Sequence, residues 1–166
     1  MATKYFPFEK AIQTGEGMER RIQAWLVEAG AVITEDNCKD GRRDFKCRFK
    51  GYDREVEVKC EDRYARTGNI CIEVAQGKVP RSSGIMVSQA DIWIHTRGDE
   101  CVLYGRKTMK KAVERWLTAG AKPEVKGDNH NQVFIQNVAA LRLSMPNVYE
   151  AVTEDLAYSR IWEREL

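Results

Sequence analysis

The sequence predicts an α/β fold in which a central mixed β-sheet is flanked by helices. Two segments carry apolar residues at helical spacing, and between them lie several runs of four to seven residues with strand-like patterns. The length of 166 residues fits one domain, and 43% hydrophobic with 31% charged residues is typical of a soluble globular protein. Because no apolar run approaches roughly 18 residues, we expect no membrane span.

The first helix is expected between Gly17 and Gly30, where Gly30 provides a stop signal. Its apolar stripe consists of Met18, Ile22, Trp25, Leu26 and Ala29. Residues 31–34 then begin a short strand, and residues 35–43 form a polar loop that is rich in turn formers. This loop leads to Asp44 at the start of the next strand.

A β-hairpin follows, with strands at residues 44–50 and 54–61 joined by a short turn at 51–53. The second strand alternates between two kinds of side chain. One face is apolar and the other is charged, the apolar face being Val56, Val58 and Cys60 and the charged face Glu55, Glu57, Lys59 and Glu61. The charged face is explained either by a solvated strand with cross-strand ion pairs or by a catalytic cluster.

The rest of the chain continues to alternate between strands and helices. We expect strands at 69–74, 90–96 and 100–104, a loop at 77–84, a basic amphipathic helix at 106–117 and a last helix at 148–162. Residues 1–120 are expected to form the core of one domain. Residues 121–166 are expected to be a C-terminal extension that packs on this core.

The overall charge does not indicate a nucleic-acid partner, because 27 Lys and Arg residues against 25 Asp and Glu residues give a formal net charge of only +2. The distribution is more informative. Residues 42–66 contain nine basic and six acidic residues, whereas residues 148–166 contain two basic and five acidic ones. A polyanion is therefore expected to approach the middle of the chain.

The cysteines and the first residues indicate the compartment. The five cysteines form no CxxC pair and are odd in number, which favours reduced thiols over a disulfide framework or a zinc site. The opening MATKYFPFEK lacks the basic and then apolar pattern of a secretory signal. We therefore expect an intracellular, cytoplasmic protein. His95 and His130 are too isolated for a histidine-based mechanism.

The charged strand offers the residues that phosphodiester hydrolysis requires. Side chains two apart on a strand project together, so Glu57 and Lys59 share a face. Magnesium uses one or two carboxylates and completes its shell with water, carbonyl and phosphate oxygens. A hairpin can bring Asp44 level with Glu57, which predicts these two acids as metal ligands, with the Val58 carbonyl as a third. Lys59 would stabilise the charge of the phosphate.

Asp44 followed by Glu57-Val58-Lys59 on a strand, after a helix that carries Glu19, resembles the PD-(D/E)xK nuclease superfamily. The pattern is most similar to archaeal-type Holliday junction resolvases and related phage nucleases, and it spans about residues 18–96. The resemblance implies a restriction-endonuclease-like core of the αβββαβ type. It also implies DNA cleavage in the cytoplasm, possible phage origin, Mg²⁺ as cofactor with Mn²⁺ as substitute, and Glu19 as an assisting residue. Arg43 stands where many members have proline.

Further residues are candidates for contacts with DNA or for an additional acid. The residues that could hold DNA phosphates lie next to Asp44 or in loops that follow the site strands, and they are Arg43, Arg63, Arg66, Lys78, Arg81 and Ser83. Solvated loop charges explain each of them equally well. Glu73 is either a further acid of the site or a member of a salt bridge.

Several functions fit this reading. Cleavage of Holliday junctions or other branched DNA would require a homodimer that cuts two strands, whereas nicking would not. A restriction-like or repair endonuclease would read a short sequence through base-edge contacts. A DNA-binding module of the same fold would bind without cleavage. An unrelated α/β protein with a charged strand would bind no metal.

Overall fold

The structure, a computed structural model, describes residues 8–36, 43–61, 67–97, 100–144 and 149–152. Its helices are α1 (Phe8–Glu28), α2 (Arg106–Thr118) and α3 (Val138–Ser144), with a 3₁₀ turn η2 (Gly84–Met86). Its strands are β1 (Val32–Glu35), β2 (Phe45–Phe49), β3 (Tyr52–Cys60), β4 (Asn69–Gln76), β5 (Arg81–Ser82), β6 (Ile92–Arg97), β7 (Glu100–Gly105), β8 (Glu124–Lys126), β9 (Asn131–Asn137) and β10 (Tyr149–Val152). The expected α/β class with a central mixed sheet is confirmed.

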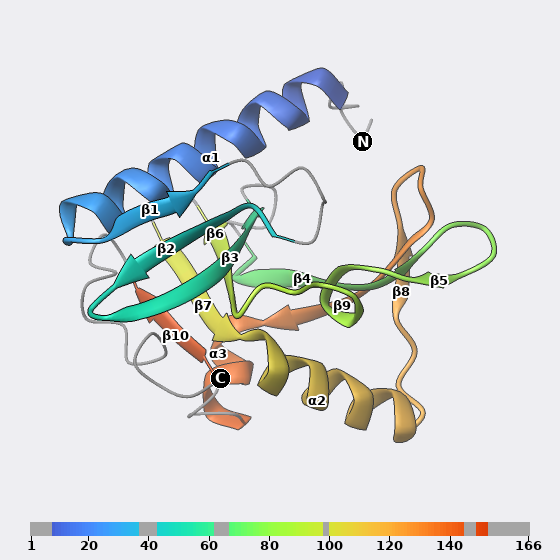
Figure 1. The fold of residues 1–166 in the computed structure, drawn as a ribbon. Helices are drawn as coiled ribbons and strands as arrows, with labels where there is room; N and C mark the ends of the chain where they lie inside the picture. The colour runs from blue at the N-terminus through green and yellow to red at the C-terminus, as the bar shows by residue number, and fades with distance from the viewer. Residues whose placement is uncertain (1–7, 37–42, 62–66, 98–99, 145–148, 153–166) are drawn as a thin grey trace.

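The strands form two sheets. Sheet A has the order β1-β2-β3-β6-β7-β10, and it is mixed because β3 and β6 run parallel while its other neighbours are antiparallel. Sheet B has the order β5-β4-β9-β8 and is antiparallel. Figure 1 shows α1 along one side of sheet A, with sheet B and α2 on the other side.

Two apolar cores hold these layers together. On one face of sheet A, Ile22 and Leu26 of α1 are fully buried against β2 and β3 residues such as Phe45 and Val56. On the other face, a second cluster joins sheet A to sheet B and α2, and Trp93 of β6 is its largest member. Burial of a side chain of this kind stabilises a fold by about 1.5–3 kcal/mol. Sheet A is therefore the middle layer of the molecule.

The predicted helix and hairpin are present with small differences. The helix begins earlier, at Phe8, and it ends as predicted because Gly30 adopts φ 100° while the Ala31 amide donates to the Leu26 carbonyl. The hairpin turn contains two residues, Lys50 and Gly51, with φ 51° and 84°. Positive φ at both positions is the geometry of a type I′ turn, so residues 52 and 53 belong to β3 and not to the turn.

Sheet topology shows the place of the third expected strand. The strand expected at residues 69–74 is present as β4, but it belongs to sheet B, and the neighbour of β3 in sheet A is β6. Parallel strands need a long crossover. In the described part of that crossover, residues 67–91, the chain forms β4, β5 and η2, where the αβββαβ order expects a helix. The predicted loop at 77–84 likewise contains β5.

The C-terminal segment also differs from expectation. Residues 149–152, predicted as helix, form strand β10, because the edge of β7 offers backbone partners that extend sheet A. The rest of that predicted helix, residues 153–162, lies outside the described residues. Between these elements, β9 pairs with β4, and Phe134, Val138 and Leu141 are buried in the second core. None of the described helices is long and apolar enough to cross a membrane.

Gly84 is expected to be the least replaceable glycine of the fold. A Cβ there would lie 2.3 Å from the Glu73 carbonyl oxygen and 2.7 Å from the Glu73 Cβ, and the residue has φ 52°. We expect Gly84→Ala to lower the free energy of unfolding by about 2 kcal/mol or more. Gly120→Ala is the matched control, since Gly120 has φ 85° but no atom within 4 Å of its added Cβ. Urea denaturation showing equal losses in the two variants would contradict the close packing of η2 on β4.

Candidate functional site

Asp44 lies directly against the backbone of β3. The hairpin register pairs Phe45 with Val56, and the Asp44 amide donates to the Val56 carbonyl at 2.9 Å. The Asp44 Oδ2 atom in turn accepts a hydrogen bond from the Val58 amide at 2.6 Å. Its carboxylate therefore lies against the backbone of β3 at Val58, the residue between Glu57 and Lys59.

Glu57 and Lys59 form an ion pair on the face of β3 that looks toward sheet B. The Lys59 Nζ is 2.5 Å from Glu57 Oε1, and it lies 5.3 Å from the centre of the Trp93 ring. The Glu57 side chain is 8% exposed and that of Lys59 is 41% exposed. Because Glu57 and Glu61 are buried, the interpretation of this face as a solvated strand is wrong for these two residues.

Helix α1 contributes Glu19 from the opposite side of sheet A. Burial raises the pKa of Glu19 to about 7, and the negative charges of Asp44, Glu16 and Glu57 act in the same direction. Charges shift a pKa in this way only when they lie nearby. Glu19 therefore lies close enough to Asp44 and Glu57 for their charges to raise its pKa, near the residue that precedes β2.

Glu73 reaches the same place from sheet B. Its charge contributes to the raised pKa of Glu57 and to the raised pKa of Lys59. Because this charge acts on both Glu57 and Lys59, the two predicted alternatives for Glu73, an acid of the site and a member of a salt bridge, stay open. The strand that carries Glu73 is not a neighbour of β3 in the sheet, so this proximity arises from the packing of sheet B on sheet A.

Electrostatically, the cluster has more negative than positive charge. Burial raises the pKa of Asp44, although the Val58 amide and Lys59 oppose this. Burial and the charges of Asp44 and Glu73 raise the pKa of Glu57, against the effect of Lys59. Burial disfavours the ammonium of Lys59, but Glu57, Asp44 and Glu73 outweigh it and hold its pKa above the ordinary value. A further cation would relieve this repulsion.

The cluster offers two carboxylates, Asp44 and Glu57, as candidate ligands for a metal ion. In the described part of the chain, no group of three or more His, Cys, Asp or Glu side chains is arranged to hold a metal. Mg²⁺ needs only one or two carboxylates. Asp44 uses Oδ2 for Val58 and Glu57 uses Oε1 for Lys59, so the second oxygen of each is the candidate ligand. The Val58 carbonyl faces the same side of β3 as its amide, toward Asp44.

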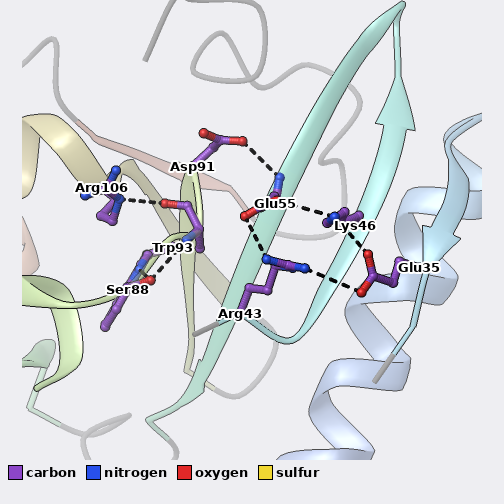
Figure 2. A network of polar contacts seen from close by, with 9 residues as sticks. Glu35, Arg43, Lys46, Glu55, Ser88, Asp91, Trp93 and Arg106 are labelled. Atoms are coloured by element: carbon purple, nitrogen blue, oxygen red, sulfur yellow. Dashed lines mark hydrogen bonds and ion pairs between the residues drawn. The ribbon is translucent and has the colours of Figure 1, made fainter. Parts of the chain in front are cut away.

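Arg43 is held in a network of charges beside this cluster. Figure 2 shows its guanidinium between Glu35 and Glu55, and each contact measures 3.4 Å. Lys46 contacts the same two carboxylates, at 2.8 and 3.6 Å. The Arg43 side chain is only 14% exposed. Its ion pairs therefore hold the chain just before Asp44 and the start of β2. Little of its side chain is exposed for contact with DNA.

The other predicted DNA contacts have different settings. Lys78 and Arg81 are exposed, on the β4–β5 connection and on β5. Ser83 is 5% exposed, its amide donates to the Val74 carbonyl, and its hydroxyl has no hydrogen-bond partner among the described residues. Arg63 and Arg66 lie outside the described residues. Among the predicted DNA contacts that the structure describes, only Lys78 and Arg81 are exposed.

Sequence reasoning missed a buried chain of polar side chains behind the cluster. Glu61, His95 and Tyr104 are hydrogen-bonded in series, and none is more than 5% exposed. The alternation of β3 placed Glu61 on the correct face. No sequence signal could identify its partners, because they come from β6 and β7 through tertiary pairing.

Comparison with models of protein families, with curated proteins and with solved structures finds no match for this chain. The residues that indicate a function are therefore those of the charge cluster, Glu19, Asp44, Glu57, Lys59 and Glu73. The four described cysteines, Cys47, Cys60, Cys71 and Cys101, are free thiols, as expected.

The raised pKa of Glu19 predicts how stability depends on pH. Between its ordinary value of 4.5 and about 7, the folded protein binds a proton that the unfolded chain releases. Without divalent metal, the free energy of unfolding is therefore expected to fall as pH rises through this window. Glu19→Gln should remove part of that slope in urea denaturation with EDTA, while Glu28→Gln, at an exposed position of α1, should retain it. Equal slopes in all three proteins would contradict the prediction.

Proposed function

We propose that the protein is a metal-dependent DNA endonuclease of the PD-(D/E)xK type, with a restriction-endonuclease-like core, acting in the cytoplasm. One observation supports this above all others. The Asp44 carboxylate is bound to the backbone of β3 between Glu57 and Lys59, with Glu19 approaching from α1. The order of α1, the antiparallel β1–β2–β3 and the parallel β6 is also compatible with such a core.

Each residue of the cluster has a distinct role in the proposed reaction. Asp44 and Glu57, with the Val58 carbonyl, would hold Mg²⁺ or Mn²⁺. When bound, the ion supplies Lewis acidity toward a phosphoryl oxygen and lowers the pKa of a water molecule. Lys59 places its ammonium against the phosphate, where charge grows in the transition state. Glu19 accepts a hydrogen bond from the attacking water.

The fixed position of the Lys59 ammonium would stabilise the transition state more than the bound substrate. Lys59 is held by Glu57, so its ammonium is oriented before the substrate arrives. Trp93 lies beneath it and limits solvent on that side. Preoriented charges of this kind need little reorganisation during the reaction. Lys78 and Arg81, which are exposed, would contact the DNA backbone.

Cleavage assays on defined DNAs test this proposal. Purified protein is incubated with supercoiled, linear, single-stranded and four-way DNA in Mg²⁺, in Mn²⁺ and in EDTA. We expect strand scission with either metal and none with EDTA. Preference for the four-way DNA would indicate a structure-specific enzyme acting as a homodimer, and a defined set of fragments would indicate sequence recognition. Salt-sensitive binding without scission would instead favour a non-catalytic DNA-binding module.

A further inference from the structure

Glu61, His95 and Tyr104 form a buried chain of hydrogen-bonded side chains. Glu61 lies two residues after Lys59, directly after the end of β3. His95 Nδ1 is 2.9 Å from Glu61 Oε1, and His95 Nε2 is 2.6 Å from the Tyr104 hydroxyl. A neutral imidazole with its proton on Nδ1 donates to the carboxylate and accepts from the tyrosine hydroxyl. This arrangement pairs both ring nitrogens of the buried His95 and the hydroxyl of the buried Tyr104.

Glu61 also connects the two sheets. Its Oε1 accepts a second hydrogen bond, from the Cys71 amide of β4, at 3.0 Å. Among the described residues, β5 pairs with β4 only at Ala75 and Gln76, at the other end of the strand. The Glu61 amide itself donates to the Thr96 carbonyl of β6 at 2.8 Å. One carboxylate oxygen thus ties the start of β4 in sheet B to β3 and β6 in sheet A.

The position of Cys71 determines the position of Glu73. The two residues are separated by one residue on a regular part of β4, where the register with β9 is unbroken from Asn69 to Glu73, so their side chains share a face. Movement of β4 at Cys71 would therefore move Glu73 relative to Glu57 and Lys59. At the far side of Glu73, η2 packs on its backbone through Gly84.

We propose that Glu61 is a positioning residue, which fixes β4 through the Cys71 amide so that Glu73 completes the charge cluster around Glu57 and Lys59. The inference rests on the proposed function, since it concerns the same site. Glu61 does not need to touch metal or substrate. Both hydrogen bonds of its Oε1 are made to protein groups, and the residue is 5% exposed. For this role, residue 61 needs an oxygen atom that can accept the hydrogen bond of the Cys71 amide, and it does not need a negative charge.

Two variants of Glu61 separate the effect of side-chain length from the effect of side-chain charge. Glu61→Gln keeps the length of the side chain and an oxygen acceptor but removes the charge, whereas Glu61→Asp keeps the charge and shortens the side chain. The affinity for Tb³⁺ is measured through luminescence sensitised by Trp93, whose ring lies 5.3 Å from Lys59 Nζ. Trp93→Phe shows which part of the signal arises at this site. Urea denaturation of each variant reports folding independently.

We expect Glu61→Asp to lower Tb³⁺ affinity on the order of tenfold, and Glu61→Gln to retain most of it. Glu73→Gln should lower the affinity similarly, and adding Glu61→Asp to Glu73→Gln should have little further effect, because the first acts through the second. A larger loss in Glu61→Gln than in Glu61→Asp, or additive losses in the double variant, would overturn the inference.

The same titration distinguishes failure of this inference from failure of the proposed function. If Asp44→Asn abolishes Tb³⁺ binding while Glu61→Asp leaves it unchanged, the proposed metal site is supported and the positioning role of Glu61 is overturned. If the wild-type protein gives no Trp93-sensitised signal, or if Asp44→Asn leaves that signal unchanged, both proposals are overturned.

Discussion

Replacing Lys59 with methionine is expected to slow DNA cleavage by about a hundredfold or more, without preventing DNA binding. Removal of one preoriented group that stabilises transition-state charge typically costs about 10²–10³ in rate. Methionine retains the length and apolar stem of lysine, so contact with the Trp93 ring is preserved while the ammonium is lost. Single-turnover cleavage in saturating Mg²⁺ measures the effect on the chemical step.

Lys46→Met provides the matched control for this experiment. Lys46 lies on the neighbouring strand, its Nζ is 2.8 Å from a Glu35 oxygen, and it is 34% exposed against 41% for Lys59. Surface ion pairs of this type contribute about 0–1 kcal/mol, so this variant should cleave at nearly the wild-type rate. Equal losses in the two variants would show that the general positive charge of the hairpin matters, and not the position of Lys59.

Replacing Asp44 with asparagine is expected to separate activity from stability. Asparagine can still accept the Val58 amide hydrogen bond, but it supplies no anionic oxygen for a metal. Cleavage should fall by at least about a hundredfold, a loss of several kcal/mol of transition-state stabilisation. The free energy of unfolding in EDTA should stay equal or increase, because a buried charge that is repelled by Glu57 and Glu19 has been removed.

Asp53→Asn is the control for the same hairpin. Asp53 is exposed and bonded to Arg48 at 2.8 Å, and this pair lies at the turn end, away from β3 residues 57 to 59. Neither activity nor stability should change appreciably in this variant. If Asp44→Asn instead lowered stability strongly in EDTA while leaving cleavage intact, Asp44 would be a structural aspartate and the proposed metal site would be wrong.

The sequence was sufficient to predict the local features of the site. Alternation along β3 placed Glu57 and Lys59 on one face, and the hairpin register brought Asp44 opposite them, as the structure confirms. The helix expected to carry Glu19 is also present, as α1. These predictions depend on the periods of strands and helices, which are local properties.

The features that could not be predicted depend on partners distant in the chain. β4 and β6 have similar apolar patterns, so the sequence did not reveal which of them pairs with β3. Tyr149–Val152 forms a strand because the edge of β7 is open to it, against its helix-like local pattern. Glu73 and Glu61 join their clusters only through the packing of two sheets, for which a single sequence carries no signal.

The most direct test of the metal centre is a crystal structure of the protein grown with Mn²⁺, with data collected at the manganese absorption edge. The account predicts one anomalous peak between the carboxylates of Asp44 and Glu57, close to the Val58 carbonyl, and its loss in Asp44→Asn. An absence of any peak there, or a peak bound only by residues outside this cluster, would contradict it.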